Sequence, residues 1–169
     1  MALRPIILIG HKTLERKSAS IEIIDDGIRT LAQDMIETLH AALGIGLSAP
    51  QVDVGVRLII VDLSIGENPD ELIVMVNPEI SSREGQCVRE EGCLSVPEVF
   101  EKVARPQKIT VRGLNLDGRE KVLEAQDLLA RVLCHEIDHL DGKLFVDRLS
   151  PLKRTLIRKK FKKAAAANS

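Results

Sequence analysis

The segment HEIDH at residues 135–139 constrains the fold of this 169-residue chain more than any other feature. It lies within residues 127–140, whose apolar positions predict a buried helix that ends just before Gly142. Histidines four residues apart on a helix share one face, about 6 Å apart along the axis, so both imidazoles reach one divalent ion. Glu136 then lies beside the ion without binding it. The fold must bury this helix and bring a third ligand to it.

The third ligand has to come from elsewhere in the chain. Downstream of the motif stand only Asp141, Asp147 and a basic tail. Upstream, the segment EEGCLSVPE at 90–98 offers Cys93, whose thiolate is a strong ligand for a borderline cation. A lone cysteine is more often a buried structural residue, so the residues alone leave both interpretations open. The other two cysteines, 87 and 134, are interpreted as structural.

Two further helices are predicted on either side of the motif helix. Residues 25–44 carry a helical apolar stripe, with Asp25 or Asp26 as its cap and Gly44 at its end. A helix near the C-terminus begins with Ser150 as cap and a proline at the first helical position. Its leucines and isoleucine, at 152, 156 and 157, are expected to pack against the body of the protein.

Between these helices the pattern is that of antiparallel strands. Residues 54–64 and 71–80 are apolar, β-branched runs that predict two strands around a turn, and residues 107–125 predict a hairpin whose turn contains Asp117-Gly118. Strands that follow one another without intervening helices favour an α+β fold. The predicted fold is therefore antiparallel β-sheets packed around a central helix that carries the HExxH metal motif, with an N-terminal and a C-terminal helix.

Composition indicates the number of domains, and the distribution of charge bears on which partners the chain could bind. With 44% hydrophobic residues, the chain suits one globular domain. Together with the metal motif, this leads us to expect a single catalytic metallohydrolase domain over residues 1–149, followed by a basic helix and tail over 150–169. The tail has seven basic and no acidic residues, so the whole-chain charge of -1 hides a strong asymmetry. A solvated helix and a ribosome-docking helix are both consistent with that charge.

Several classes of partner and location are disfavoured. Aromatic residues make up only 2%, which argues against base-stacking platforms and gives no reason to expect DNA binding. No apolar stretch approaches the length of a membrane span, and the run Ile6–Gly10 is too short for a signal peptide. Three sparse cysteines suggest a reducing compartment, so a cytoplasmic location is expected, with an organellar origin left open.

Three motifs together resemble the signatures of the peptide deformylases. They are GIGLSAPQ at 44–51, EGCLS at 91–95 and HEIDHLDG at 135–142, in the order and spacing of that family. The resemblance extends from the first helix to the end of the motif helix. It implies that the metal ligands are Cys93, His135 and His139. It also implies that Glu136 is the general base, and that Gln51 and the backbone N–H of Leu94 bind the formyl oxygen.

The resemblance also implies an activity. Deformylases remove the N-formyl group from nascent chains that start with formyl-methionine, usually with ferrous iron, although zinc, nickel or cobalt can occupy the site. N-formylmethionyl nascent peptides are therefore the expected partners, with the ribosome as a possible second partner of the basic helix. The chain departs from the family at Ser48, where alanine is usual, and at Cys134, where glutamine is usual.

Residues for substrate binding follow from helix and strand geometry. Positions 128 and 132 share a helix face with His135, so Leu128 and Val132, with Ile45, could wall a methionine pocket or simply belong to the core. Glycines let a substrate strand approach the backbone closely, and three are placed to do so: Gly44, Gly46 and Gly92. Glu91 lies two residues before the cysteine, on the same side of a strand, and is expected to pair with Arg105 and brace the site.

Competing functions can be weighed against these residues. The segment GIGLSA at 44–49 fits the dinucleotide pattern G-x-G-x-x-A, but it follows a helix where that loop must follow a strand. An HExxH endopeptidase would not need Cys93 or Gln51. A non-catalytic deformylase-like protein that binds chain ends or ribosomes would not need every catalytic position to be filled, as they are here.

Overall fold

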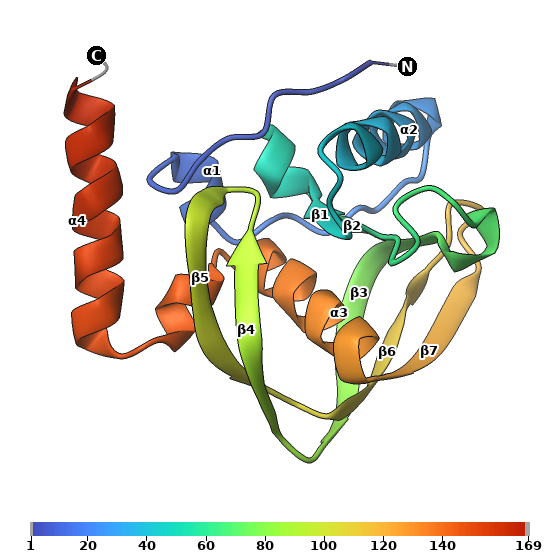
Figure 1. The fold of residues 1–169 in the computed structure, drawn as a ribbon. Helices are drawn as coiled ribbons and strands as arrows, with labels where there is room; N and C mark the ends of the chain where they lie inside the picture. The colour runs from blue at the N-terminus through green and yellow to red at the C-terminus, as the bar shows by residue number, and fades with distance from the viewer. Residues whose placement is uncertain (1, 168–169) are drawn as a thin grey trace.

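The computed structural model describes residues 2–167, which form four α-helices and two antiparallel sheets (Figure 1). The helices are α1 (Lys12–Glu15), α2 (Asp26–Ala41), α3 (Asp127–Leu140) and α4 (Pro151–Ala167). Three short 3-10 turns accompany them: η1 (Ala49–Val52), η2 (Pro69–Glu71) and η3 (Phe145–Arg148). The expected mixed fold with antiparallel sheets is confirmed.

The larger sheet has five strands in the order β1-β2-β3-β6-β7, and every neighbouring pair is antiparallel. Its strands are β1 (Gly46–Ser48), β2 (Leu58–Val61), β3 (Ile73–Glu84), β6 (Lys108–Leu114) and β7 (Glu120–Gln126). The smaller sheet is a hairpin of β4 (Cys87–Cys93) and β5 (Val96–Arg105). Within residues 2–167, strand β1 pairs only with β2 and strand β4 pairs only with β5. Strand β1 is therefore an edge strand of the larger sheet, and β4 has an unpaired edge in the smaller one.

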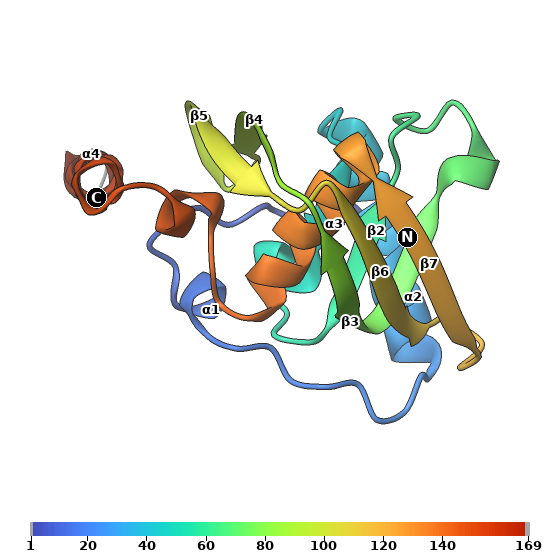
Figure 2. The same ribbon diagram turned by 90° about the horizontal axis from the view of Figure 1, so that it is seen from below.

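Helix α3 contacts strands of both sheets, and the two views show it between them (Figures 1 and 2). Its apolar residues, among them Leu133 and Leu140, share one core with Ile59, Val61 and Met75 of the five-stranded sheet. A second core lies between α2 and the strands β1 to β3, and a third joins β5 to η3. Every residue from 130 to 140 is buried, including the polar ones, which therefore need partners inside the protein.

The helix boundaries agree with most of the sequence predictions. The Asp25 carboxylate caps α2 by accepting the Ile28 N–H, and Gly142 follows α3 with a φ of 76°. Helix α2 ends at Ala41, however, and the left-handed residue after it is Leu43 rather than the predicted Gly44. The short helix α1 was not predicted.

Among the strands, the hairpin β6–β7 lies where it was predicted, with Gly118 in its turn at a φ of 78°. The strand predicted over 54–64 is limited to β2, because Val54 instead closes the turn after η1 through a hydrogen bond from its N–H to the carbonyl of Ala49. The hairpin β4–β5 was not predicted, although it carries Cys93 at the end of its first strand.

Helix α4 begins at Pro151 as predicted, and the Ser150 hydroxyl accepts the Lys153 N–H. The prediction that its leucines pack on the body is wrong, since Leu152 is 69% exposed and Leu156 is 56% exposed. The third core is contacted by Ile157, as predicted, and by Phe161, which lies one turn after it. Figure 1 shows α4 standing beside the body of the protein. None of the helices within residues 2–167 has the length and apolar character needed to cross a membrane.

Candidate metal centre

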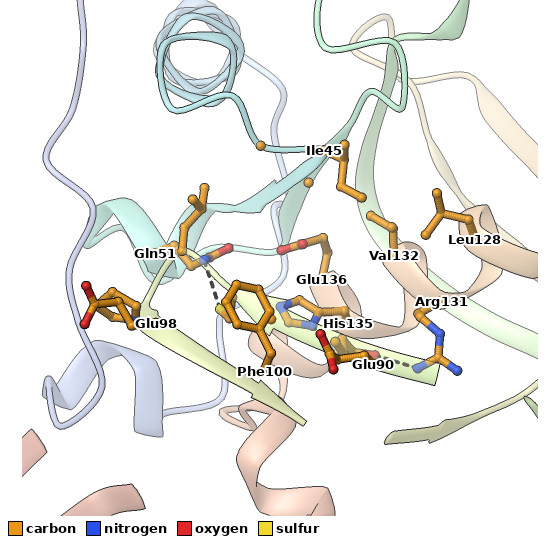
Figure 3. Close-up of a pocket in the computed structure, with 17 residues that line it drawn as sticks. Ile45, Gln51, Glu90, Glu98, Phe100, Leu128, Arg131, Val132, His135 and Glu136 are labelled. Carbon is orange, nitrogen blue, oxygen red and sulfur yellow. Dashed lines mark hydrogen bonds and ion pairs between the residues drawn. The ribbon is translucent and has the colours of Figure 1, made fainter. Parts of the chain in front are cut away.

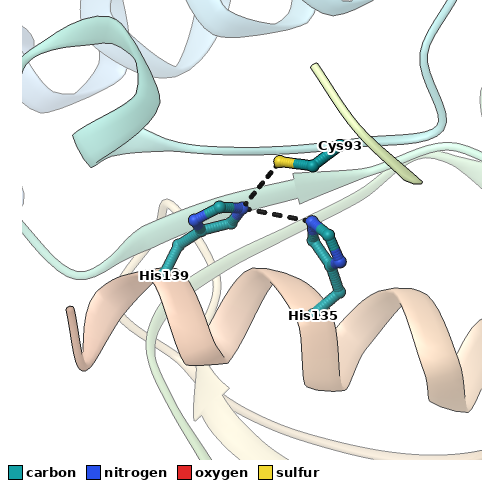
Figure 4. A group of neighbouring side chains, drawn as sticks. All are labelled: Cys93, His135 and His139. Carbon is teal, nitrogen blue, oxygen red and sulfur yellow. Dashed lines mark hydrogen bonds between the residues drawn. The ribbon is translucent and has the colours of Figure 1, made fainter. Parts of the chain in front are cut away.

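Three potential metal ligands converge where α3 passes the end of β4. The His139 Nε2 atom lies 3.1 Å from His135 Nε2 and 3.4 Å from Cys93 Sγ (Figure 4). One ligand atom from each residue falls within 4.8 Å of the others. Helix geometry places the two histidines together, as predicted, and the end of the β4–β5 hairpin supplies the thiol. The structure thus brings together the three residues that the resemblance implied.

Hydrogen bonding leaves His135 with its Nε2 atom available as a ligand. Its Nδ1 lies 2.7 Å from Glu91 Oε2, and because a carboxylate only accepts, Nδ1 carries the proton. Nε2 then faces the other two candidate ligands, and it can bind a metal ion once its own proton is displaced. Burial and the neighbouring His135 lower the pKa of His139 well below its ordinary value, so its imidazole is neutral as a ligand must be.

The donor set fits a divalent metal ion. Burial disfavours a charged His135, but the neighbouring Cys93 and Glu136 outweigh burial and raise the pKa of this histidine. The cluster therefore attracts positive charge. One thiolate and two imidazoles suit borderline cations such as zinc and ferrous iron, and three protein ligands leave a coordination position for water or substrate.

Glu91 is held by four hydrogen bonds. Arg105 Nε and Nη2 donate to its two oxygens at 3.1 and 2.7 Å, and Arg131 Nη1 donates at 3.0 Å, in addition to the contact from His135. Burial alone raises the pKa of Glu91, but the His135 and Arg105 hydrogen bonds outweigh it and hold that pKa well below its usual range. The predicted pairing of Glu91 with Arg105 is present. The contribution of Arg131 was not predicted.

Glu136 is a buried carboxylic acid beside the candidate ligands. Its side chain is only 3% exposed, Oε1 has no hydrogen bond within residues 2–167, and that atom lies 3.9 Å from His139 Nε2. Burial is the main cause that raises the pKa of Glu136 to about 7, and the negative charge of Glu91 contributes. A carboxylate with a pKa near neutrality is well matched to general base catalysis.

Gln51 presents its amide N–H₂ to the same space. Its Oε1 accepts hydrogen bonds from the Ser48 N–H at 2.9 Å and the Ser48 hydroxyl at 3.1 Å. Because the oxygen is engaged there, Nε2 is directed toward Cys93 Sγ at 3.7 Å and Ser95 Oγ at 3.2 Å. The serine that departs from the family pattern therefore supports the orientation of Gln51. The other departure, Cys134, lies in the core between α3 and the five-stranded sheet.

A cavity of about 420 Å³ opens beside the ligands (Figure 3). It is bordered by Gln51, Leu94 and Glu136 and by all the residues predicted for substrate binding: Gly44, Ile45, Gly46, Gly92, Leu128 and Val132. Leu128 is 52% exposed, so it forms part of the rim rather than the core. The sequence did not predict the contribution of the hairpin residues Pro97, Glu98 and Phe100, because the second strand of the hairpin was not expected.

Two of these glycines are required by close approach. A Cβ atom on Gly46 would lie 2.6 Å from Glu136 Oε2 and 2.8 Å from Val132 Cγ1. A Cβ atom on Gly92 would lie 2.6 Å from the Phe100 ring. The backbone of β1 therefore passes directly over the carboxylate of Glu136, and that of β4 lies directly beneath an aromatic ring.

Comparisons with known proteins agree with this geometry. The family model described as polypeptide deformylase matches residues 3–155. A peptide deformylase from Acidobacterium capsulatum is 46% identical over 99% of this chain and 98% of its own length, and one from Thermodesulfovibrio yellowstonii is 49% identical over 96% and 98%. The crystal structure of a peptide deformylase from Legionella pneumophila superposes with a TM-score of 0.89 at 43% identity, covering 97% of this chain and 98% of that one. The chain belongs to the polypeptide deformylase family.

Proposed function

We propose that the chain hydrolyses the N-formyl group from the formyl-methionine that begins newly synthesised polypeptides. The observation that carries the proposal is the convergence of Cys93, His135 and His139 beside the buried Glu136, in a cavity that the Gln51 amide also reaches. Family membership supports the same reaction. Neither a dinucleotide-binding protein nor a non-catalytic relative would need this combination.

One divalent metal ion is proposed as the cofactor, held by Cys93, His135 and His139. Ferrous iron is the proposed native ion, and zinc, nickel or cobalt are alternatives in a purified sample. When bound, such an ion lowers the pKa of a water molecule toward neutrality and polarises a carbonyl oxygen.

The protein groups then have separate roles in the hydrolysis. Glu136 accepts the proton of the attacking water at a carboxylate oxygen and delivers it to the nitrogen of the departing amine. The Gln51 Nε2–H₂ and the Leu94 N–H donate to the oxygen of the formyl group as negative charge develops on it. One such donor typically contributes about 3 kcal/mol to transition-state stabilisation.

Two free strand edges border the cavity and can bind the peptide. Strand β1 lies at the edge of one sheet, and β4 has a free edge in the other. An extended substrate backbone is proposed to lie near Gly46 and Gly92, with its methionine side chain against Ile45, Leu128 and Val132. Actinonin, with which a peptide deformylase from Ehrlichia chaffeensis was crystallised, is expected to bind the same cavity.

The chain is proposed to divide into a catalytic metallohydrolase domain over 1–149, built around α3 as the central helix with the HExxH motif, and a basic helix and tail over 150–169. The seven cations and the absence of acids in residues 150–169 support docking of α4 on ribosomal RNA. Action on nascent chains in the cytoplasm is consistent with that role.

The decisive experiment measures release of formate from formyl-Met-Ala-Ser under anaerobic conditions, with metal analysis of the same sample. Stoichiometric metal together with formate release supports the proposal. Cleavage of an unformylated peptide at internal bonds would indicate an endopeptidase instead. Metal-loaded protein without either activity would indicate the non-catalytic alternative.

Ribosome docking needs its own experiment. Deletion of residues 150–169 should abolish co-sedimentation with ribosomes at low salt, and the full chain should lose its binding steeply as salt is raised. Deformylation of the short free peptide serves as the control for folding of the shortened protein. Equal ribosome binding by both proteins would rule out docking through α4.

A further inference from the structure

Asp138 lies between the two histidines of the motif and has no role in the hydrolysis proposed above. Its buried carboxylate accepts a hydrogen bond from Arg105 Nη1 at 2.6 Å. Arg148 of η3 binds the same carboxylate with two hydrogen bonds, from Nε to Oδ2 at 2.7 Å and from Nη2 to Oδ1 at 2.8 Å. A two-pronged contact of this kind fixes the orientation of a carboxylate as well as its charge.

These contacts extend to the candidate metal centre. Asp138 accepts hydrogen bonds from both Arg148 and Arg105. Arg105 also donates to Glu91, and Glu91 accepts the hydrogen bond from His135 Nδ1. The donor–acceptor distances along this series lie between 2.6 and 3.1 Å. The series leaves α3 at Asp138, crosses the β4–β5 hairpin, and returns to α3 one turn earlier at His135.

The candidate ligands come from two elements, α3 and the β4–β5 hairpin, which are joined by the ion pairs of Arg105. His135 and His139 belong to α3, whereas Cys93 belongs to β4, so the site depends on how α3 sits against the hairpin. Arg105 ends β5 and reaches Asp138 of α3. Arg131 of α3 makes further contacts, to the carbonyls of Val103 at 2.9 Å and Cys87 at 2.8 Å.

We propose that Asp138 and Arg148 are positioning residues for the metal ligand His135; this inference rests on the proposed metal-dependent function. With its Nη1 engaged by Asp138, Arg105 presents Nε and Nη2 to the two oxygens of Glu91. Loss of Asp138 or of its fixed orientation frees the guanidinium to turn. Glu91 then loses its alignment with the imidazole, and the angle at which His135 meets the ion changes.

Arg148 offers the clean test because it is the half-exposed end of the series. Arg148→Ala leaves Asp138 paired with Arg105, so the variant should fold. Arg148→Lys keeps the charge but loses the two-pronged contact. Asp138→Asn tests the contact between Asp138 and Arg105 by removing the charge of the carboxylate. Arg112→Ala is the matched control, since it breaks an exposed arginine–carboxylate pair of 2.9 Å far from the ligands.

Each variant is loaded with Co²⁺, and three properties are measured: Co²⁺ loss to a chelator, the Co²⁺ absorption spectrum, and thermal unfolding of the metal-free protein. Arg148→Ala should lose Co²⁺ about tenfold more readily than the control and shift its absorption bands, because partners outside the ligand set typically change metal affinity 10- to 100-fold. Arg148→Lys should fall between the two. Unfolding of the metal-free protein should match the control.

Co²⁺ retention and spectra equal to those of the control in both Arg148 variants would overturn the proposal. So would a change confined to unfolding of the metal-free protein, since that is the mark of a structural ion pair alone. If Asp138→Asn fails to fold, the Arg148 variants decide. Altered Co²⁺ retention in a protein that never releases formate would support the positioning role and contradict the proposed function separately.

Discussion

Replacement of Gly46 by alanine tests whether the carboxylate of Glu136 must occupy its observed place. The new Cβ would stand 2.6 Å from Glu136 Oε2, about 0.8 Å closer than an ordinary contact of 3.4 Å. Gly46 has no positive φ, so its backbone accepts a side chain without strain. Strand β1 cannot simply retreat, because Gly46 is paired with Val61 of β2. The carboxylate must therefore move, since Val132 on the other side is buried and β-branched.

The size of the effect follows from that displacement. A misplacement of about 1 Å at a reacting group costs on the order of 10²-fold in rate, or about 2.7 kcal/mol. We expect kcat/KM for formyl-Met-Ala-Ser to fall by roughly that factor. Overpacking at the buried β1–α3 contact should lower the free energy of unfolding by about 1–3 kcal/mol. Metal content should not change, because the three atoms nearest to the added methyl group belong to Glu136 and Val132 rather than to a proposed ligand.

Gly55→Ala is the matched control, since a Cβ at that position meets nothing within 4 Å and its φ is also not positive. Its activity should equal that of the parent, and its stability should stay within about 0.5 kcal/mol. The reasoning would be refuted if Gly46→Ala kept its metal and a kcat/KM within threefold of the control. Loss of metal from Gly46→Ala would refute it too, because the damage would then lie at the ligands.

Three further outcomes are expected. Glu136→Gln should keep its metal but lower kcat by about 10²- to 10⁴-fold, and near-normal turnover would disprove its role as base. Gln51→Ala should lower kcat by about 10²- to 10³-fold, whereas a rise in KM alone would indicate uniform substrate binding. Burial opposes ionisation of Asp62, but hydrogen bonds from Ser64 and His40 lower its pKa. The parent should therefore be more stable than Asp62→Asn at neutral pH, and the difference should shrink as pH falls below about 4; urea unfolding across pH measures it.

The parts of the structure that sequence could predict are those fixed by local geometry. Helix periodicity places His135 and His139 on one face whatever surrounds them, and the Asp117-Gly118 pair turns a chain into a hairpin without distant contacts. The family motifs added Cys93, which the residues alone had left undecided between a ligand and a structural cysteine.

The β4–β5 hairpin shows why other parts could not be predicted. Along β4 the single buried residue is Glu91, and the rest of the strand is partly or fully exposed. A search for alternating apolar residues therefore does not identify the hairpin, because the buried position carries a charge. The exposed leucines of α4 show the opposite error, in which only Ile157 of the predicted apolar stripe packs on the body.

Buried charge is the property that links the β4–β5 hairpin to the metal centre. Four of the five residues in the segment 135–139 are polar, and all five are buried, so physical chemistry requires partners for them. The sequence cannot name those partners, because His135 meets Glu91 across 44 positions and Asp138 meets Arg105 across 33. A motif therefore points to the proposed ligands, whereas we infer that their alignment depends on charges on distant strands. The polar, buried residues of α3 outside the proposed ligand set are where the sequence is least informative and where substitution should reveal most.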